Sequence, residues 1–187
     1  MRILSPLSLL LLCFFLVPML HADEQKLKRI VTLTPSDGES IDIASLEIVK
    51  EKEGTYTYSI NMDDSKFGNH FLSMRPFKCF QGPKQMLCYL PYPYKKTTKL
   101  SETDLQDLEY DLLFIHRKAT DYGINPWNGL YYKLTLDKDA KLSGILKEVD
   151  LDILASPPEK GVTRPITDTD LNEADPNSHS YPTLKIH

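Results

Sequence analysis

A two-residue alternation of apolar and polar side chains is the feature that most constrains the fold of this chain. Between Thr55 and Met62, every even position is apolar and every odd position is Thr, Ser or Asn. Successive side chains of a β-strand point to opposite faces, so this pattern is typical of a strand with one buried face. Leucine or tyrosine likewise occupies the even positions of residues 129–136. After the polar turn 137–140, residues 141–153 return with alternating apolar positions, which predicts an antiparallel hairpin.

Three further segments are strand-like. Residues 41–50 alternate until the parity slips near Ala44 and Ser45, which predicts a bulge or a break. Residues 71–80 and 85–90 are rich in apolar side chains and flank a short turn, so we expect them to pair with each other.

One segment, from Glu102 to Phe114, has the spacing of a helix, because its apolar residues recur three or four positions apart. This stripe consists of Leu105, Leu108, Leu112 and Ile115. Residues 112–115 could equally form a buried strand. The predicted fold class is therefore α+β and β-rich, a mostly antiparallel sheet with one helix near 102–114. Closure of that sheet as a barrel or a sandwich is left open.

The composition of the chain changes at Ser156. Prolines, acids and small polar residues dominate from there to about Tyr181, a mixture that buries little apolar surface. We therefore expect a single β-rich domain over residues 23–155, followed by an extended or partly disordered arm over residues 156–187.

The first 22 residues have the features of a secretory signal peptide. Arg2 supplies positive charge, an apolar run extends from Ile3 to Leu20, and Ala22 is the small residue that cleavage requires. An uncleaved membrane anchor is the alternative, but the run is short for the roughly 20 residues of a spanning helix. Lipid attachment at Cys13 is disfavoured by its place within the apolar run. We expect an exported protein, periplasmic or secreted, with no stable membrane span after cleavage.

Cleavage would leave two of the three cysteines, Cys79 and Cys88. The residues between them include Gln81–Lys84 (QGPK), which has turn chemistry, so two strands folding back there would place the cysteines opposite each other. In an oxidising compartment such a pair predicts a disulfide. A free buried pair and a redox or metal pair are the alternatives, but the spacing is not C-x-x-C.

Charge and motifs exclude several functions. The formal net charge of −4 argues against a nucleic-acid partner, which requires a basic surface. Asp168–Asn172 imitates the start of a calcium loop, but the glycine and glutamate that such a loop needs are replaced by Glu173 and His179. The histidines lack metal-ligand spacing, and the motifs of nucleophilic enzymes are missing. We predict no metal, no cofactor and no catalytic residue.

Aromatic residues on turns are the remaining functional signal. They cluster in two loop regions, and Tyr or Trp on loops commonly forms binding surfaces. The candidate binding residues are Arg75, Tyr92, Tyr94, Trp127 and Tyr131. The alternative for the aromatics is packing in the core. For Arg75, the expected role is an ion pair with a buried acid such as Asp111 or Glu109, and the alternative is contact with an anionic ligand.

Four runs of residues between Phe71 and Pro158 carry a resemblance to a known family. They are FLSMRPFKC, QMLCYLPYPY, DLEYDLLFI and INPWNGLYYKLTLD. The chain resembles a family of exported proteobacterial proteins to which no activity is assigned. The resemblance implies a periplasmic setting and carries over no ligand or catalytic residue.

The expected function is a non-catalytic binding or interaction protein, with an envelope protein or a small ligand as its partner. The alternative is a small cell-envelope hydrolase with a non-local active site, in which His70 or His116 would approach a carboxylate or a hydroxyl.

Overall fold

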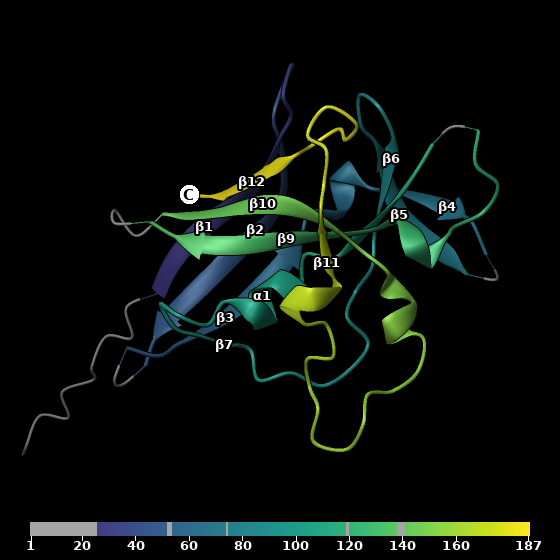
Figure 1. The fold of residues 1–187 in the computed structure, drawn as a ribbon. Coiled ribbons are helices and arrows are strands. Elements are labelled where there is room, and N and C mark those ends of the chain that lie inside the picture. The colour runs from purple at the N-terminus through teal and green to yellow at the C-terminus, as the bar shows by residue number, and fades with distance from the viewer. Residues whose placement is uncertain (1–25, 52–53, 74, 119, 138–140) are drawn as a thin grey trace, which may run out of the picture.

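The computed structural model describes residues 26–187 except 52–53, 74, 119 and 138–140 (Figure 1). The predicted signal peptide, its cleavage site and Cys13 therefore lie outside the described residues. The strands are β1 (Lys26–Thr34), β2 (Ile41–Lys50), β3 (Tyr56–Met62), β4 (Gly68–Phe71), β5 (Pro76–Gln81), β6 (Met86–Tyr89), β7 (Lys99–Leu100), β8 (Phe114–Arg117), β9 (Gly129–Leu136), β10 (Leu142–Val149), β11 (Leu171–Glu173) and β12 (Thr183–Ile186).

The helical elements are short. They are the α-helix α1 (Gln106–Tyr110) and the 3₁₀ turns η1 (Asp64–Lys66), η2 (Pro126–Asn128), η3 (Leu151–Leu154) and η4 (Asp168–Asp170). The helix predicted over 102–114 is thus confined to five residues. Residues 112–114 are fully buried and Ile115 nearly so, and such a run suits a strand covered on both faces. Accordingly, β8 begins at Phe114 and pairs with β6 and β9.

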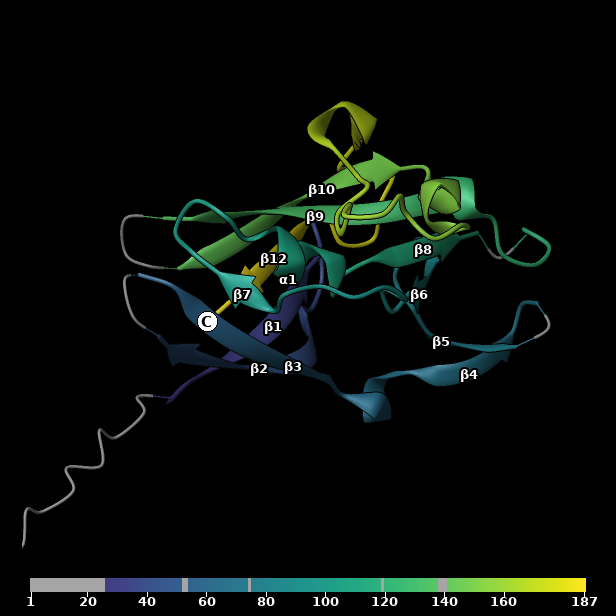
Figure 2. The ribbon, with the colours of Figure 1, turned by 90° about the horizontal axis from the view of Figure 1, so that it is seen from below.

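The strands form one antiparallel sheet in the order β4-β5-β6-β8-β9-β10-β12-β1-β2-β3-β7, with β11 added to β10. The predicted β-rich, mostly antiparallel fold is confirmed. The sheet is not closed, because β4 and β7 are its two edges. Figure 2 shows that it curls, so that β9 and β10 form one layer, β2 and β3 face them, and α1 lies between the layers.

The core fills the inside of this curl. Strands from both layers and α1 contribute fully buried side chains to one cluster, including Leu33, Leu46, Leu108, Tyr132 and Leu184. The alternation that predicted β3 reflects this one-sided burial. The β9–β10 hairpin is present, but residues 129–132 of β9 are buried on both faces, and Ile145 of β10, expected on the apolar face, is exposed. The slip predicted near Ala44 is also present, since the β1–β2 register shifts between Val31 and Thr32, opposite Ala44 and Asp42.

The C-terminal segment corrects the prediction of a separate arm. β12 lies in the middle of the sheet, hydrogen-bonded to β10 on one side and β1 on the other. Leu184 and Ile186 are buried in the core, and Ile166 is buried in a second cluster under η3. The composition of residues 156–187 did not reveal this strand, because β12 has only four residues and the segment before it is mostly loop with few apolar side chains. The domain predicted over 23–155 therefore lacks one of its central strands.

The predicted disulfide is present. Cys79 and Cys88 are directly opposite in the β5–β6 ladder, with their Cα atoms 4.0 Å apart. The intervening turn is closed by a bond from Gly82 N to Gln85 O of 3.0 Å. In the chain-entropy model, a loop of this size contributes about 2.5 kcal/mol to the free energy of unfolding.

We expect Leu184→Ala to lower the free energy of unfolding by about 3 kcal/mol, because it opens a cavity in the core. Lys185→Ala is the matched control on the same strand, where the side chain is exposed, and should change stability by less than about 0.5 kcal/mol. Urea denaturation followed by circular dichroism measures both. Equal small effects would contradict the central position of β12.

Candidate functional site

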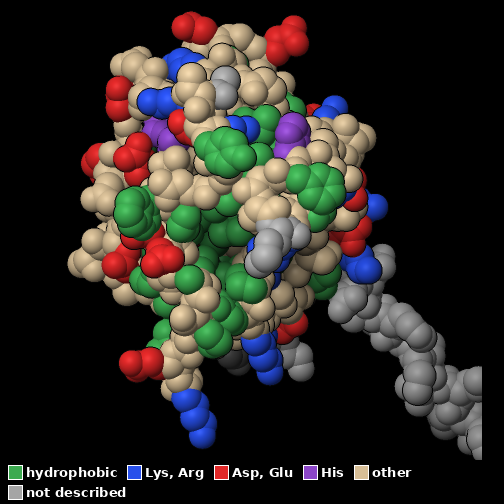
Figure 3. All heavy atoms as spheres, turned by 90° about the vertical axis from the view of Figure 1, so that its right-hand side faces the viewer, with side chains coloured by type: hydrophobic (Ala, Val, Ile, Leu, Met, Phe, Trp, Pro, Cys, Tyr) green, Lys and Arg blue, Asp and Glu red, His purple; other side chains and the backbone are tan. Residues whose placement is uncertain are grey.

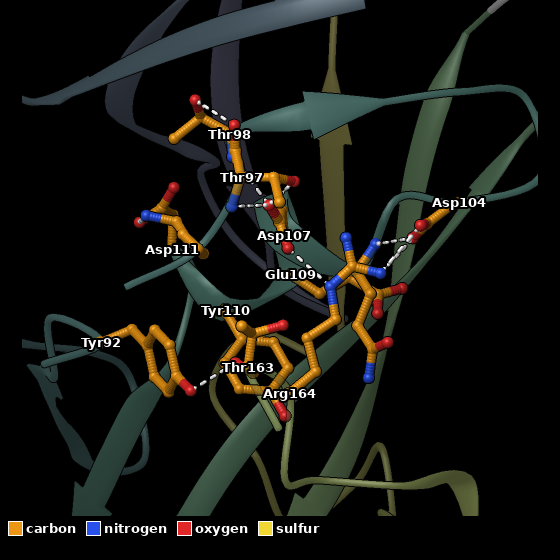
Figure 4. A network of polar contacts seen from close by, with 12 residues as sticks. Tyr92, Thr97, Thr98, Asp104, Asp107, Glu109, Tyr110, Asp111, Thr163 and Arg164 are labelled. Carbon is orange, nitrogen blue, oxygen red and sulfur yellow. Dashed lines mark hydrogen bonds and ion pairs between the residues drawn. The ribbon is translucent and has the colours of Figure 1, made fainter. Parts of the chain in front are cut away.

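Three buried carboxylates extend from α1 and the residue that follows it, in different directions (Figure 4). They belong to Asp107, Glu109 and Asp111, which are 0%, 2% and 8% exposed. A buried carboxylate is costly unless it is paired or hydrogen-bonded, so the partners of each define what this cluster does.

Asp107 joins two loops to α1. Its Oδ2 accepts hydrogen bonds from the N–H of Thr97 at 2.8 Å and of Thr98 at 2.7 Å, and from the Thr97 hydroxyl at 2.7 Å. Its Oδ1 accepts from Arg164 Nε at 2.6 Å. Burial raises the pKa of Asp107, but the Thr97 hydroxyl and the Arg164 guanidinium outweigh burial and hold it below its ordinary value. The ionised carboxylate is therefore a structural crosslink.

Glu109 is directed toward β9. Its Oε1 accepts from the Leu134 N–H at 2.7 Å, and its Oε2 accepts from the Tyr131 hydroxyl. Lys133 Nζ is 3.9 Å from Oε2. Burial raises the pKa of Glu109, and these donors oppose that rise only in part. Both oxygens are engaged by the protein, so Glu109 also serves the fold.

Asp111 is bonded to Lys96 and Tyr58, which corrects the prediction that Arg75 pairs with Asp111 or Glu109. Lys96 Nζ is 2.6 Å from Oδ1, and the Tyr58 hydroxyl donates to Oδ2 at 2.8 Å. Arg75 is exposed on the β4–β5 turn, with its guanidinium carbon 5.4 Å from the centroid of the Phe77 ring. That contact is a cation–π interaction at the surface.

Three of the five candidate binding residues lie in or beside the second hydrophobic cluster. Tyr131 is 1% exposed, and Tyr92 is buried with its hydroxyl on Thr163 O at 2.6 Å. Tyr94 is half-buried and donates to Leu154 O at 3.0 Å. The ring of Tyr110 contacts Tyr92 and Tyr131 edge to face. The structure therefore supports packing in the core, not a binding surface, for these three tyrosines.

Trp127 and Arg75 are at the surface, as are two aromatic residues outside the predicted binding residues. Phe71 is 78% exposed, Trp127 69%, and Tyr122 fully exposed, which makes them the three most exposed large hydrophobic residues described. Phe71 ends β4, whereas Tyr122 and Trp127 belong to the loop between β8 and β9. We call these three residues and Arg75 the aromatic end.

The two loops of the aromatic end touch each other. Gly123 has a φ of +72°, and a Cβ built there would lie 3.3 Å from the Leu72 carbonyl oxygen. Leu72 and Ile124 pack on one cluster formed by Phe77 and the disulfide. Figure 3 shows this end of the molecule, where hydrophobic side chains form a band and charged ones lie mostly toward the margins.

A polar hollow opens beside Tyr122. It has a volume of about 280 Å³ and is lined by Arg117, Asp121, Tyr122, Gly123, Asn125 and Asn128. Arg117 donates from Nη2 to the Asp121 carbonyl, while its Nε is buried and has no hydrogen-bond partner among the described residues. The aromatic end thus adjoins a polar hollow that contains a cationic side chain.

His116 and His179 form a pair near the β5–β6 turn. His179 Nδ1 is 2.8 Å from Gln85 Nε2, and its Nε2 is 2.8 Å from Glu148 Oε1. His116 packs edge-on against His179, with ring centroids 5.1 Å apart. Burial, and then the neighbouring His179, lower the pKa of His116. Both ring nitrogens of His179 are engaged, so the pair fastens residue 179 to β10 and to the β5–β6 turn.

A scan against models of protein families found no match, and searches of curated proteins and of solved structures found none either. Among the described residues, no helix is long and apolar enough to cross a membrane, and no group of three or more His, Cys, Asp and Glu could hold a metal ion. What the protein does is therefore inferred from its own side chains.

Asp107→Ala should lower the free energy of unfolding by about 3–5 kcal/mol, because it leaves Arg164 without a buried partner. Asp104→Ala is the matched control. Asp104 binds the same guanidinium at 2.8 Å, but its side chain is 48% exposed, and we expect a loss below about 1 kcal/mol. Chemical denaturation of the two variants compares them directly, and equal losses would show that Asp107 is not the crosslink described.

Proposed function

We propose that this chain is an exported, non-catalytic binding protein of the proteobacterial family that it resembles, and that its aromatic end binds a partner protein of the cell envelope. One observation carries the proposal: among the described residues, the three most exposed large hydrophobic side chains are all aromatic and lie on two loops that touch. Scattered exposed hydrophobics are ordinary on a protein surface, whereas a group of this kind is typical of an interaction site.

The energetic argument follows from the size of aromatic side chains. Each buries 150–250 Å² when covered, and Trp and Tyr are enriched among the residues that dominate interface energies. Rigid presentation reduces the entropy lost on binding. Asn125 supports that rigidity, since its side chain accepts from the Trp127 N–H at 3.1 Å. The disulfide cluster beneath Leu72 and Ile124 supports the same end from below.

The polar groups favour a partner with an acidic or carbonyl-rich surface. Arg75 lies on one loop, and Arg117 lines the hollow beside Tyr122. Arginine flanking aromatic residues is a common composition at the centre of interfaces. An envelope protein with acidic side chains around an apolar patch would satisfy both features.

A photocrosslinking residue placed at Trp127 or Phe71 in intact cells should trap the same partner. Ile145 is the matched control, because it is 57% exposed and hydrophobic but lies on β10, outside the aromatic end. Immunoblotting under denaturing conditions detects the adduct. Crosslinks of equal intensity from Ile145, or none from Trp127 and Phe71, would contradict the proposal. Adducts with a small molecule, detected by mass spectrometry, would show that the aromatic end binds a small ligand instead of a partner protein.

Export has its own test. Intact mass spectrometry of the chain recovered from the periplasmic fraction should correspond to a protein that begins at Asp23 with Cys79 and Cys88 oxidised, two hydrogens lighter than the reduced form. A chain that retains residues 1–22, or that carries two free thiols after fractionation, would argue against export by cleavage.

A further inference from the structure

The end of β9 at Leu136 and the start of β10 at Leu142 lie on the side of the molecule away from β4 (Figure 1). A second opening is lined by both residues. It is an apolar cavity of about 160 Å³ that continues the core outward between the two layers. Its apolar lining includes Leu27, Ile48, Leu100, Leu136, Leu142 and Ile186. Leu27 is 43% exposed, so apolar surface reaches the mouth of the cavity. Openings of this kind between layers of β-structure are common ligand sites.

Arg29 is the unusual residue of this cavity. Leu27, Arg29 and Val31 share one face of β1, and Val31 on that face is fully buried in the core. Across the ladder Arg29 is opposite Leu46, which is also fully buried. A half-buried cation on an apolar face carries a desolvation cost that an anionic partner offsets.

The described residues provide no such partner. The guanidinium donates one bond of 3.2 Å, to the carbonyl of Lys28, and forms no ion pair in the part of the chain that the structure describes. Lys28, on the opposite face of the strand, does pair with Glu47 at 3.4 Å. Arginine presents a planar fork that matches a carboxylate with two parallel hydrogen bonds. The cavity therefore combines an apolar interior with an unused carboxylate-binding group at its mouth.

We propose that this cavity binds the aliphatic tail of a medium-chain carboxylate, with the carboxylate held by Arg29. A cavity of about 150 Å³ accommodates a ligand the size of benzene, so the space suits a tail of about six carbons. Glu102 also lines the cavity and disfavours a second negative charge, which selects a single carboxylate over a phosphate dianion. The site is independent of the aromatic end.

Isothermal titration calorimetry of the mature chain with butanoate, hexanoate, octanoate and decanoate tests the tail. Each methylene that enters the cavity should strengthen binding about fourfold, until the gain stops near octanoate. A gain that continues unchanged to decanoate, or the absence of saturable binding, would overturn the proposal. Methyl chemical shifts in the octanoate complex should change for Leu136 and Leu142, and changes confined to the aromatic end would overturn the location.

The head group is tested with Arg29→Gln and the neutral probe 1-octanol. The variant should bind octanoate at least tenfold more weakly and bind 1-octanol as the natural chain does, because only the carboxylate uses the guanidinium. Lys28→Gln removes an equal charge from the opposite face of the same strand and should leave octanoate binding unchanged. Equal losses in both variants, or no loss in Arg29→Gln, would overturn the role of Arg29. If Arg29→Gln does not fold, the natural chain tests the same point. It should bind 1-octanol more weakly than octanoate, and equal binding would overturn the role of Arg29.

Discussion

The hydrogen bonding of β12 on both of its edges is the constraint on which the architecture depends. On one side β12 pairs with β10, and on the other with β1. Without it, the strands from β4 to β10 and the strands β1 to β3 with β7 would be two sheets with exposed inner edges. Because those edges carry unpaired backbone groups next to a large apolar surface, neither half would be stable alone.

Buried charge on α1 supplies a second kind of constraint. A five-residue helix has little intrinsic stability, so its place inside the curl is set by its tertiary contacts. Asp107 secures the loop at Thr97 and the segment at Arg164, whereas Glu109 is bonded to β9. The buried carboxylates thus orient the helix where apolar packing alone would allow it to rotate.

Local patterns predicted much of the sheet. The period-two alternation in β3 arises from one-sided burial, and the turn between Cys79 and Cys88 brings those residues into register. In β9 the alternation does not follow burial, because residues 129–132 are buried on both faces. The central place of β12 could not be predicted, because strand order depends on pairing across the whole chain. For the same reason, the sequence could not show that Lys96 and Tyr58 are the partners of Asp111. Sequence also could not distinguish Trp127, which is exposed in the aromatic end, from Tyr131, which is buried in the second cluster four residues later.

The position of β12 also bears on how such a chain is made. One of the two neighbours of β1 is formed by residues 183–186, which are synthesised about 150 residues after it. The sheet cannot be completed until that segment has emerged, and pairing over so long a separation is intrinsically slow. A chain threaded through a membrane in extended form needs such a delay, since a domain that folded early would be unable to pass. For the exported chain proposed above, late completion of the sheet would leave the polypeptide extended during translocation.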